Sequence, residues 1–187
     1  MGNIISRLKQ NWLLQLFTIG LRYLLGSAFV YASIFKIQGI RFTATSGENT
    51  PIGTLPHFFE TMYQAGIYWH FIGWGQLLAG FLLMSQAFST LGAAAFLPII
   101  LNIFIITTSF NSPTILLITF LMSLSNVYLL VWDWNKLKFI VLPEPLHYSD
   151  DTALLSKWKG WTYAGLVLFV AVVSLRLFQI HYWNKVH

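Results

Sequence analysis

Apolar residues along this chain form long runs that are separated by shorter polar segments. A helix needs about 20 predominantly apolar residues to cross about 30 Å of hydrocarbon, because each residue adds about 1.5 Å. Five runs reach this length and are predicted to be membrane-spanning helices: Trp12 to Ile37, Ile67 to Phe88, Thr90 to Phe110, Pro113 to Trp134 and Trp161 to Trp183. The pattern therefore predicts an all-α integral membrane helical bundle.

Two stretches between the predicted spans are too polar to lie within the bilayer. Gln38 to Pro56 is rich in glycine, serine and threonine and is predicted to be a loop, and Pro56 to Gln64 is predicted to form a short interfacial helix. Asn135 to Gly160 is predicted to be a polar connector with one surface helix, Asp151 to Lys159.

These segments divide the chain into a four-helix transmembrane core over 1–134, a connector over 135–160 and a fifth transmembrane helix with its tail over 161–187. Lysine and arginine near helix ends indicate the orientation, since cytoplasmic loops are enriched in both. A cytoplasmic N-terminus puts Arg7, Lys9, Lys136, Lys138, Lys157 and Lys159 inside and Lys36, Arg41 and Lys185 outside. We therefore expect a protein of the bacterial inner (cytoplasmic) membrane with a cytoplasmic connector and an external, periplasmic C-terminus.

Composition supports the membrane assignment and excludes several kinds of chemistry. Of the 187 residues, 56% are hydrophobic and 9% are charged, whereas soluble domains carry roughly 25% charged residues. The absence of cysteine excludes thiolate catalysis and cysteine-ligated metal or iron–sulfur sites. The net charge of +5 is scattered over helix ends, so we expect the lipid bilayer and other membrane subunits as partners, and no nucleic acid.

Arg22 is predicted to lie near the bilayer centre, where a charge is costly and needs a partner. Four polar residues are expected at a similar depth in the second, third and fourth spans, and with Arg22 they would form an intramembrane polar layer: Gln76, Asn102, Ser123 and Asn126. We expect Arg22 to bond to Gln76 or Asn102. The layer is interpreted either as structural glue between helices or as a functional site.

A second group of polar residues is expected near the outer surface. Its members are candidates for a ligand pocket at the mouth of the bundle: Lys36, His57, Glu60, His70 and Arg176. Such a pocket could bind a quinone headgroup or an anionic substrate and exchange protons with it. The alternative is a set of hydrated and snorkelling side chains at the interface, where polarity costs little.

Cofactor and metal chemistry finds little support in the sequence. His70 and His181 are predicted at roughly the same outer level, but two isolated histidines are weak evidence for a haem. No metal site and no catalytic residue is assigned, and a quinone stays open as a ligand. An independent transporter is disfavoured because no inverted repeat is visible.

Two segments resemble the DoxX family of small membrane proteins. The first span carries Arg22-Tyr23-Leu24-Leu25-Gly26-Ser27-Ala28-Phe29 and then Ser33-Ile34-Phe35-Lys36, and the second carries Gly73-Trp74-Gly75-Gln76-Leu77-Leu78-Ala79-Gly80. The resemblance covers about the first four spans. It implies a four-helix bundle of the kind found in quinone-reducing sulfur-oxidising enzymes and other membrane redox assemblies.

The chain departs from that family pattern at two points. Gln76 stands where many relatives have glutamate, which puts proton-coupled chemistry in doubt, and the connector and fifth span are additional. We therefore expect a subunit or partner of a membrane redox (respiratory-type) complex that binds quinone or lipid in the bundle and has no catalytic activity alone. The alternative function is an inert scaffold or assembly factor for a membrane protein complex.

Overall fold

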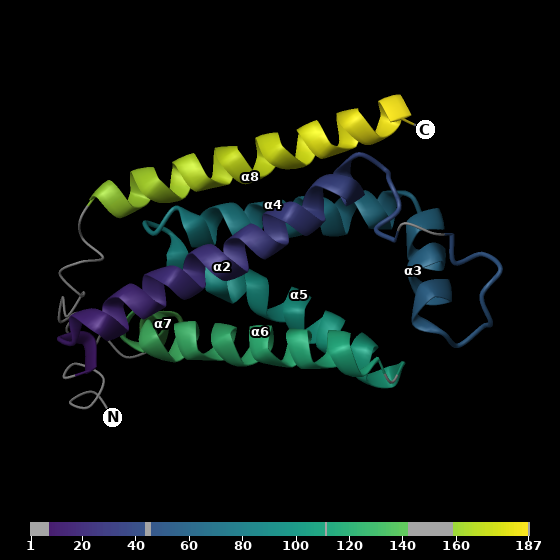
Figure 1. The fold of residues 1–187 in the computed structure, drawn as a ribbon. Helices are drawn as coiled ribbons and strands as arrows, with labels where there is room; N and C mark the ends of the chain where they lie inside the picture. Colours follow the sequence, from purple (N-terminus) through teal and green to yellow (C-terminus); the bar gives the residue numbers. More distant parts are fainter. Residues whose placement is uncertain (1–7, 44–45, 111, 142–158, 187) are drawn as a thin grey trace.

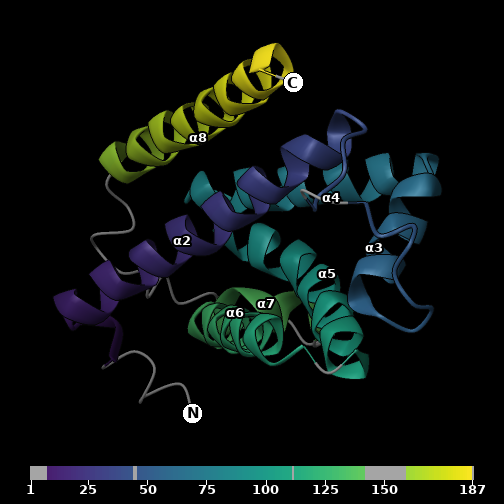
Figure 2. The same cartoon turned by 45° about the vertical axis from the view of Figure 1, so that its right-hand side comes forward.

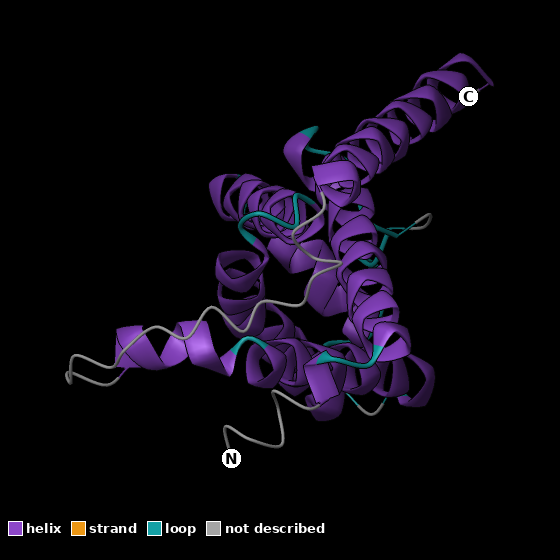
Figure 3. Ribbon diagram, turned by 90° about the vertical axis from the view of Figure 1, so that its left-hand side faces the viewer, coloured by secondary structure: helices purple, strands orange, loops and turns teal. Residues whose placement is uncertain are grey.

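The computed structural model describes residues 8–43, 46–110, 112–141 and 159–186, and this part of the chain is helical with connecting loops and no strand (Figures 1 and 3). Its longer helices are α2 (Trp12–Ile37), α3 (Leu55–Gln64), α4 (Ile67–Met84), α5 (Ser89–Ser109), α6 (Pro113–Trp132), α7 (Trp134–Val141) and α8 (Lys159–Val186). The predicted surface helix from Asp151 falls on residues outside these ranges, apart from Lys159, which begins α8.

Five of these helices are long and apolar enough to cross a membrane: α2, α4, α5, α6 and α8. Their outward faces carry large apolar side chains, such as Leu24, Phe71 and Val167, which are about two-thirds exposed or more. Apolar surface on this scale suits contact with lipid tails and not with water. The structure thus confirms the all-α membrane helical bundle.

The helices are arranged in chain order, so that α2 packs on α4, α4 on α5 and α5 on α6. Helix α8 lies along α2 and α4, on the opposite side of these helices from α6 (Figures 1 and 2). A core of buried apolar residues fills the middle of the bundle: Leu25, Phe29, Ala79, Leu83, Ala93, Phe96, Ile100 and Leu129. Within this core the rings of Phe29 and Phe96 stack with centroids 3.6 Å apart and join α2 to α5.

Glycines allow the backbones of α2 and α4 to approach closely. A Cβ atom on Gly80 would lie 2.8 Å from the carbonyl oxygen of Gly26, and one on Gly73 would lie 2.8 Å from the Cβ of Lys36. Both distances are too short for a real Cβ atom. The close packing of α2 against α4 therefore depends on the absence of a side chain at Gly73 and Gly80. Gly66 has a different role, since it precedes α4 with a positive φ of 54°.

The two ends of the bundle differ in what closes them. At the α3 end, α3 lies beside the end of α2 and the start of α4, and the ring of Phe58 lies 5.3 Å from that of Phe110 at the α5–α6 turn. At the α7 end, the α4–α5 turn meets the end of α6 and the start of α8 (Figure 1). The predicted interfacial helix is present as α3, whereas α7 lies in the segment that we predicted to be a connector.

Candidate functional site

Polar side chains inside the bundle gather into two separate clusters, one at each end. The first, which we name the Arg22 network, consists of Arg22, Gln86, Thr90 and Asp133 at the α7 end. The second, which we name the α3-end cluster, consists of Lys36, Arg41, Glu60, Trp69 and Arg176 together with the aromatic rings around them.

The Arg22 network is built around a buried ion pair. Arg22 Nη2 lies 2.9 Å from Asp133 Oδ2, and the two side chains are 3% and 7% exposed. Arg22 Nη1 also donates to Gln86 Oε1 at 3.1 Å, and Thr90 Oγ1 donates to Asp133 Oδ2 at 2.9 Å. The network therefore connects α2, the α4–α5 turn, the first turn of α5 and the end of α6.

The position of Arg22 differs from the prediction in depth and in partner. The predicted bond to Gln76 or Asn102 is wrong, since Arg22 bonds to Gln86 and Asp133 and Asn102 is exposed on α5. Helix α2 has 26 residues and α4 has 18, a difference of eight residues or about 12 Å of helix. Arg22 thus lies beyond the last turn of α4, where the chain turns and polar groups gather.

Charge complementarity was the signal that could have identified the partner. Asp133 is the only acidic residue between Glu60 and Glu144 in the sequence. A buried arginine needs a counter-charge more than it needs an amide, because an unpaired charge in an apolar interior is the costlier state. The predicted polar layer did not include Asp133, which directly follows the last residue of α6.

The remaining residues of the predicted polar layer make separate local contacts. Asn126 Nδ2 donates to the carbonyl oxygen of Ala93 at 3.1 Å, and Ser123 Oγ donates to the carbonyl oxygen of Thr119 at 2.8 Å. Gln76 is 2% exposed, and its Oε1 atom has no hydrogen-bond partner among the described residues. These contacts do not join into one layer with Arg22.

At the α3 end, Lys36 is 7% exposed on the last turn of α2. Its Nζ donates to the carbonyl oxygen of Ala32 at 3.0 Å and lies 4.7 Å from the ring centre of Phe42 and 5.2 Å from that of Trp69. Trp69 is fixed in turn, because its Nε1 donates to the carbonyl oxygen of Ile40 at 3.1 Å. The ammonium therefore lies against two aromatic faces, an arrangement that favours a cation.

Glu60 of α3 is paired with the loop and is not available to Lys36. Its two carboxylate oxygens accept from Arg41 Nε at 3.0 and 2.9 Å, and one of them accepts from the backbone N–H of Gly47 at 3.1 Å. Burial alone would raise the pKa of Glu60, but the Gly47 N–H and the Arg41 guanidinium outweigh it and hold the pKa below its ordinary value. Glu60 is thus a fixed anion that pins α3 to the preceding loop.

Arg176 of α8 reaches the same end of the bundle from the other side of α2. Its guanidinium carbon lies 3.7 Å from the ring centre of Tyr31 and 3.5 Å from that of Phe35. Nη1 donates to the hydroxyl of Tyr31 and to Gln179 Oε1, whereas the buried Nε has no partner among the described residues. Because Phe35 directly precedes Lys36 in α2, two cations lie near this end of the helix.

The candidate histidines lie at the margin of the α3-end cluster. His70 is exposed, and its Nδ1 lies 2.9 Å from the carbonyl oxygen of Gly66. His57 is half-buried on α3, and its Nδ1 is buried without a partner in the described part of the chain. Of the five predicted pocket residues, Arg176 packs on Phe35, next to Lys36 in α2, and Glu60 is held in an ion pair with Arg41.

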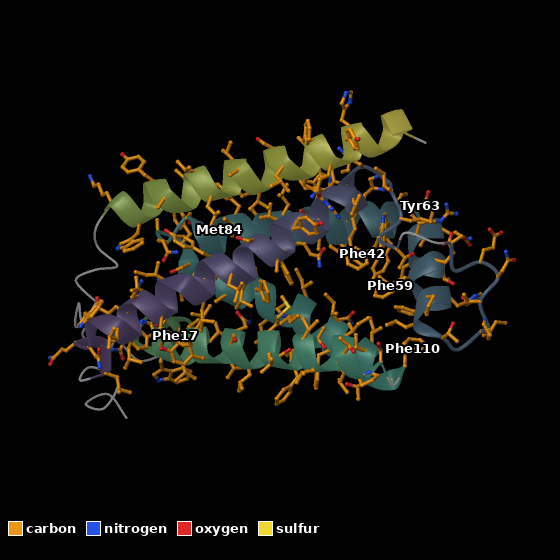
Figure 4. The ribbon with its side chains drawn as sticks, in the orientation of Figure 1. Phe17, Phe42, Phe59, Tyr63, Met84 and Phe110 are labelled. Carbon is orange, nitrogen blue, oxygen red and sulfur yellow. The ribbon has the colours of Figure 1, made fainter. Side chains whose placement is uncertain are left out.

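Aromatic side chains surround this end of the bundle. Phe42 and Phe59 have ring centres 6.0 Å apart, and Figure 4 shows Phe42, Phe59, Tyr63 and Phe110 gathered near α3. A hollow in the described surface lies against the last turns of α5 and the first turns of α6, with a mostly apolar lining: Phe104, Thr108, Pro113, Leu116, Leu117 and Phe120. The hollow has no charged lining residue, so we place the candidate site at the α3-end cluster.

The two clusters differ in net charge. The Arg22 network is neutral, because one arginine faces one aspartate. The α3-end cluster contains three cations (Lys36, Arg41 and Arg176) and one anion (Glu60), a net charge of +2.

Comparison of the chain with protein-family models, with curated proteins and with solved structures gave no match.

Proposed function

We propose that this chain is a polytopic subunit or partner of a membrane redox (respiratory-type) complex and holds the headgroup of a quinone or lipid at the α3 end of its bundle. The observation that carries the proposal is the buried Lys36, which faces Phe42 and Trp69 and has no carboxylate partner among the described residues. A buried cation at the end of a membrane span is a functional-site candidate by default. The resemblance of the first two spans to the DoxX family supports the redox setting.

The chemistry of the cluster fits the binding of a headgroup better than catalysis. Lys36 and Arg176 offer hydrogen-bond donors, and the neighbouring rings offer apolar walls for a planar or lipid-like group. Quinone carbonyls and lipid phosphates both accept such bonds. We assign no catalytic residue, and we propose that any electron transfer belongs to partner subunits.

The alternative is a catalytically inert scaffold or assembly factor. The filled centre of the bundle favours it, because the core residues between α2, α4, α5 and α6 pack tightly around Phe29 and Phe96. A scaffold needs a stable shape and a partner, and it needs no ligand.

Analysis of molecules that co-purify with the full chain tests the proposal. We expect solvent extracts of the gently purified protein to contain a quinone or lipid in near-stoichiometric amount, and Lys36→Met to lose it while remaining folded. Lys159→Gln, which removes an exposed cation from the opposite end of α8, is the matched control and should retain the molecule. Protein that carries no such molecule but holds a partner tightly would support the scaffold instead.

The proposed orientation puts the N-terminus in the cytoplasm of a bacterial inner membrane and the C-terminus outside. It follows from the excess of lysine and arginine on the side that holds the N-terminus and α7. Reporters that work on one side of the membrane can test it. A reporter fused at Lys138 should be active in its cytoplasmic form and one at Lys185 in its external form, and the reverse result at both sites would invert the topology.

A further inference from the structure

Lys36 and Arg176 are buried cations without a counter-charge in the described part of the chain. Each is 7% exposed. The ion pairs among the described residues join Arg22 to Asp133 and Arg41 to Glu60. Arg176 packs against Tyr31 and Phe35 on α2, and Lys36 follows Phe35 directly in that helix. Lys36 on α2 and Arg176 on α8 therefore both lie at the last part of α2.

The surrounding rings reduce the cost of burying these charges but do not neutralise them. Aromatic faces attract a cation through their quadrupole and carry no net charge. An arginine also cannot shed its proton in a protein, so Arg176 stays charged. Neutralising the pair requires an anion from outside the described residues.

The unused donors of the two side chains indicate the chemistry of that anion. Lys36 Nζ carries three N–H groups, and one donates to the carbonyl oxygen of Ala32. On Arg176, Nη1 is engaged by Tyr31 and Gln179, and the buried Nε has no partner. Several N–H donors around a net positive charge suit a phosphate, which offers several acceptor oxygens.

The depth of the pair indicates the source of the phosphate. Lys36 lies on the last turn of α2, next to its end at Ile37. Helix ends lie at the level of the lipid headgroups, and basic pockets between membrane helices bind anionic headgroups there. A neutral quinone would supply acceptor atoms but no charge.

We propose that Lys36 and Arg176 bind the phosphate of an anionic phospholipid at the α3 end, where α8 packs on α2 through Arg176. This inference rests on the proposed headgroup site and names the class of ligand. It is independent of the redox partnership, which is tested by the co-purifying subunits and quinone.

Native mass spectrometry of the purified full chain with defined lipids tests the inference. Phosphatidylglycerol and phosphatidylcholine would be added separately at equal concentration. Each basic side chain near a headgroup contributes about fivefold in affinity, so we expect a preference of about 30-fold for phosphatidylglycerol. Equal binding of the two lipids by the parent chain would overturn the proposal without requiring any variant.

Three variants assign the effect to the two residues. Lys36→Met and Arg176→Gln should each reduce the preference about fivefold, and Arg176→Lys should retain most of it because the charge remains. Lys159→Gln removes an exposed cation from the first turn of α8 and should keep the full preference. A preference that survives both neutralising variants would exclude this pair as the site.

Two further additions separate the sources of the ligand. Inorganic phosphate should raise the melting temperature in detergent much less than phosphatidylglycerol does; an equal rise would mean a small-ion site and would overturn the lipid assignment. A short-chain quinone that competes with phosphatidylglycerol and binds more tightly would overturn the anionic class while leaving the proposed headgroup function intact. If the parent chain binds neither phosphatidylglycerol nor quinone, both this inference and the proposed headgroup function are contradicted.

Discussion

Replacing Arg22 with leucine is expected to destabilise the folded bundle by about 3–5 kcal/mol. The substitution removes one member of a buried ion pair whose atoms lie 2.9 Å apart and leaves the Asp133 carboxylate, 7% exposed, without its counter-charge. It also removes the donor to Gln86. Thermal unfolding of the purified protein in detergent, followed by circular dichroism, measures the loss.

A double variant separates the pair from the rest of the network. When Arg22→Leu is combined with Asp133→Leu, no uncompensated charge remains, so the double variant is expected to be more stable than Arg22→Leu alone. The Thr90 hydroxyl then loses its acceptor, at a cost of about 1–3 kcal/mol. If the double variant is as unstable as the sum of the single ones, the two side chains do not interact.

Lys36→Met provides a second contrast, because Lys36 is also buried but has no carboxylate beside it in the described chain. Its removal relieves the repulsion from Arg176 and costs the contacts with Phe42 and Trp69, which are worth about 1 kcal/mol. The melting temperature should therefore stay near that of the parent. A Lys36→Met variant that melts well below Arg22→Leu would show that the structural role belongs to the α3 end.

Helix positions were predictable from the sequence because the bilayer imposes a length and a polarity on each span. Trp12 to Ile37 was predicted to its last residue, and Pro113 begins α6 directly after Ser112, as a proline following an N-cap residue should. Helix α7 was missed because it is short, contains Asn135, Lys136 and Lys138, and lies in a stretch whose composition is that of a connector.

Side-chain partners were less predictable, because they depend on the relative depth of helices of unequal length. Lys36 and Arg176 were predicted near one end of the bundle, and in the structure Arg176 packs on Phe35, the residue before Lys36 in α2. The pairing of Glu60 with Arg41 depends on the path of the loop, which brings Gly47 within 3.1 Å of the carboxylate. No periodicity in the sequence specifies that path.

Close packing of α4 against α5 depends on Gly92, and Gly92→Ala is expected to destabilise the bundle by about 2–3 kcal/mol. A Cβ atom at this position would lie 2.5 Å from the backbone nitrogen of Leu83 and 2.9 Å from the carbonyl carbon of Leu82. Backbone atoms inside a helix cannot rotate out of the way, so the two helices would have to separate. The α4–α5 turn would have to move with them.

Gly75→Ala is the matched control, because it adds the same methyl group at the same pair of helices, from α4 toward α5. There the nearest atom to an added Cβ is the Cδ1 of Ile99 at 3.7 Å, an ordinary contact. Alanine is favoured over glycine within a helix by about 0.5–1 kcal/mol, so Gly75→Ala should leave the melting temperature unchanged or raise it. Unfolding curves of both variants beside the parent give the comparison. Equal melting temperatures for Gly92→Ala and Gly75→Ala would contradict the close contact between Gly92 and the backbone of Leu83, which leaves an added Cβ only 2.5 Å from the Leu83 nitrogen.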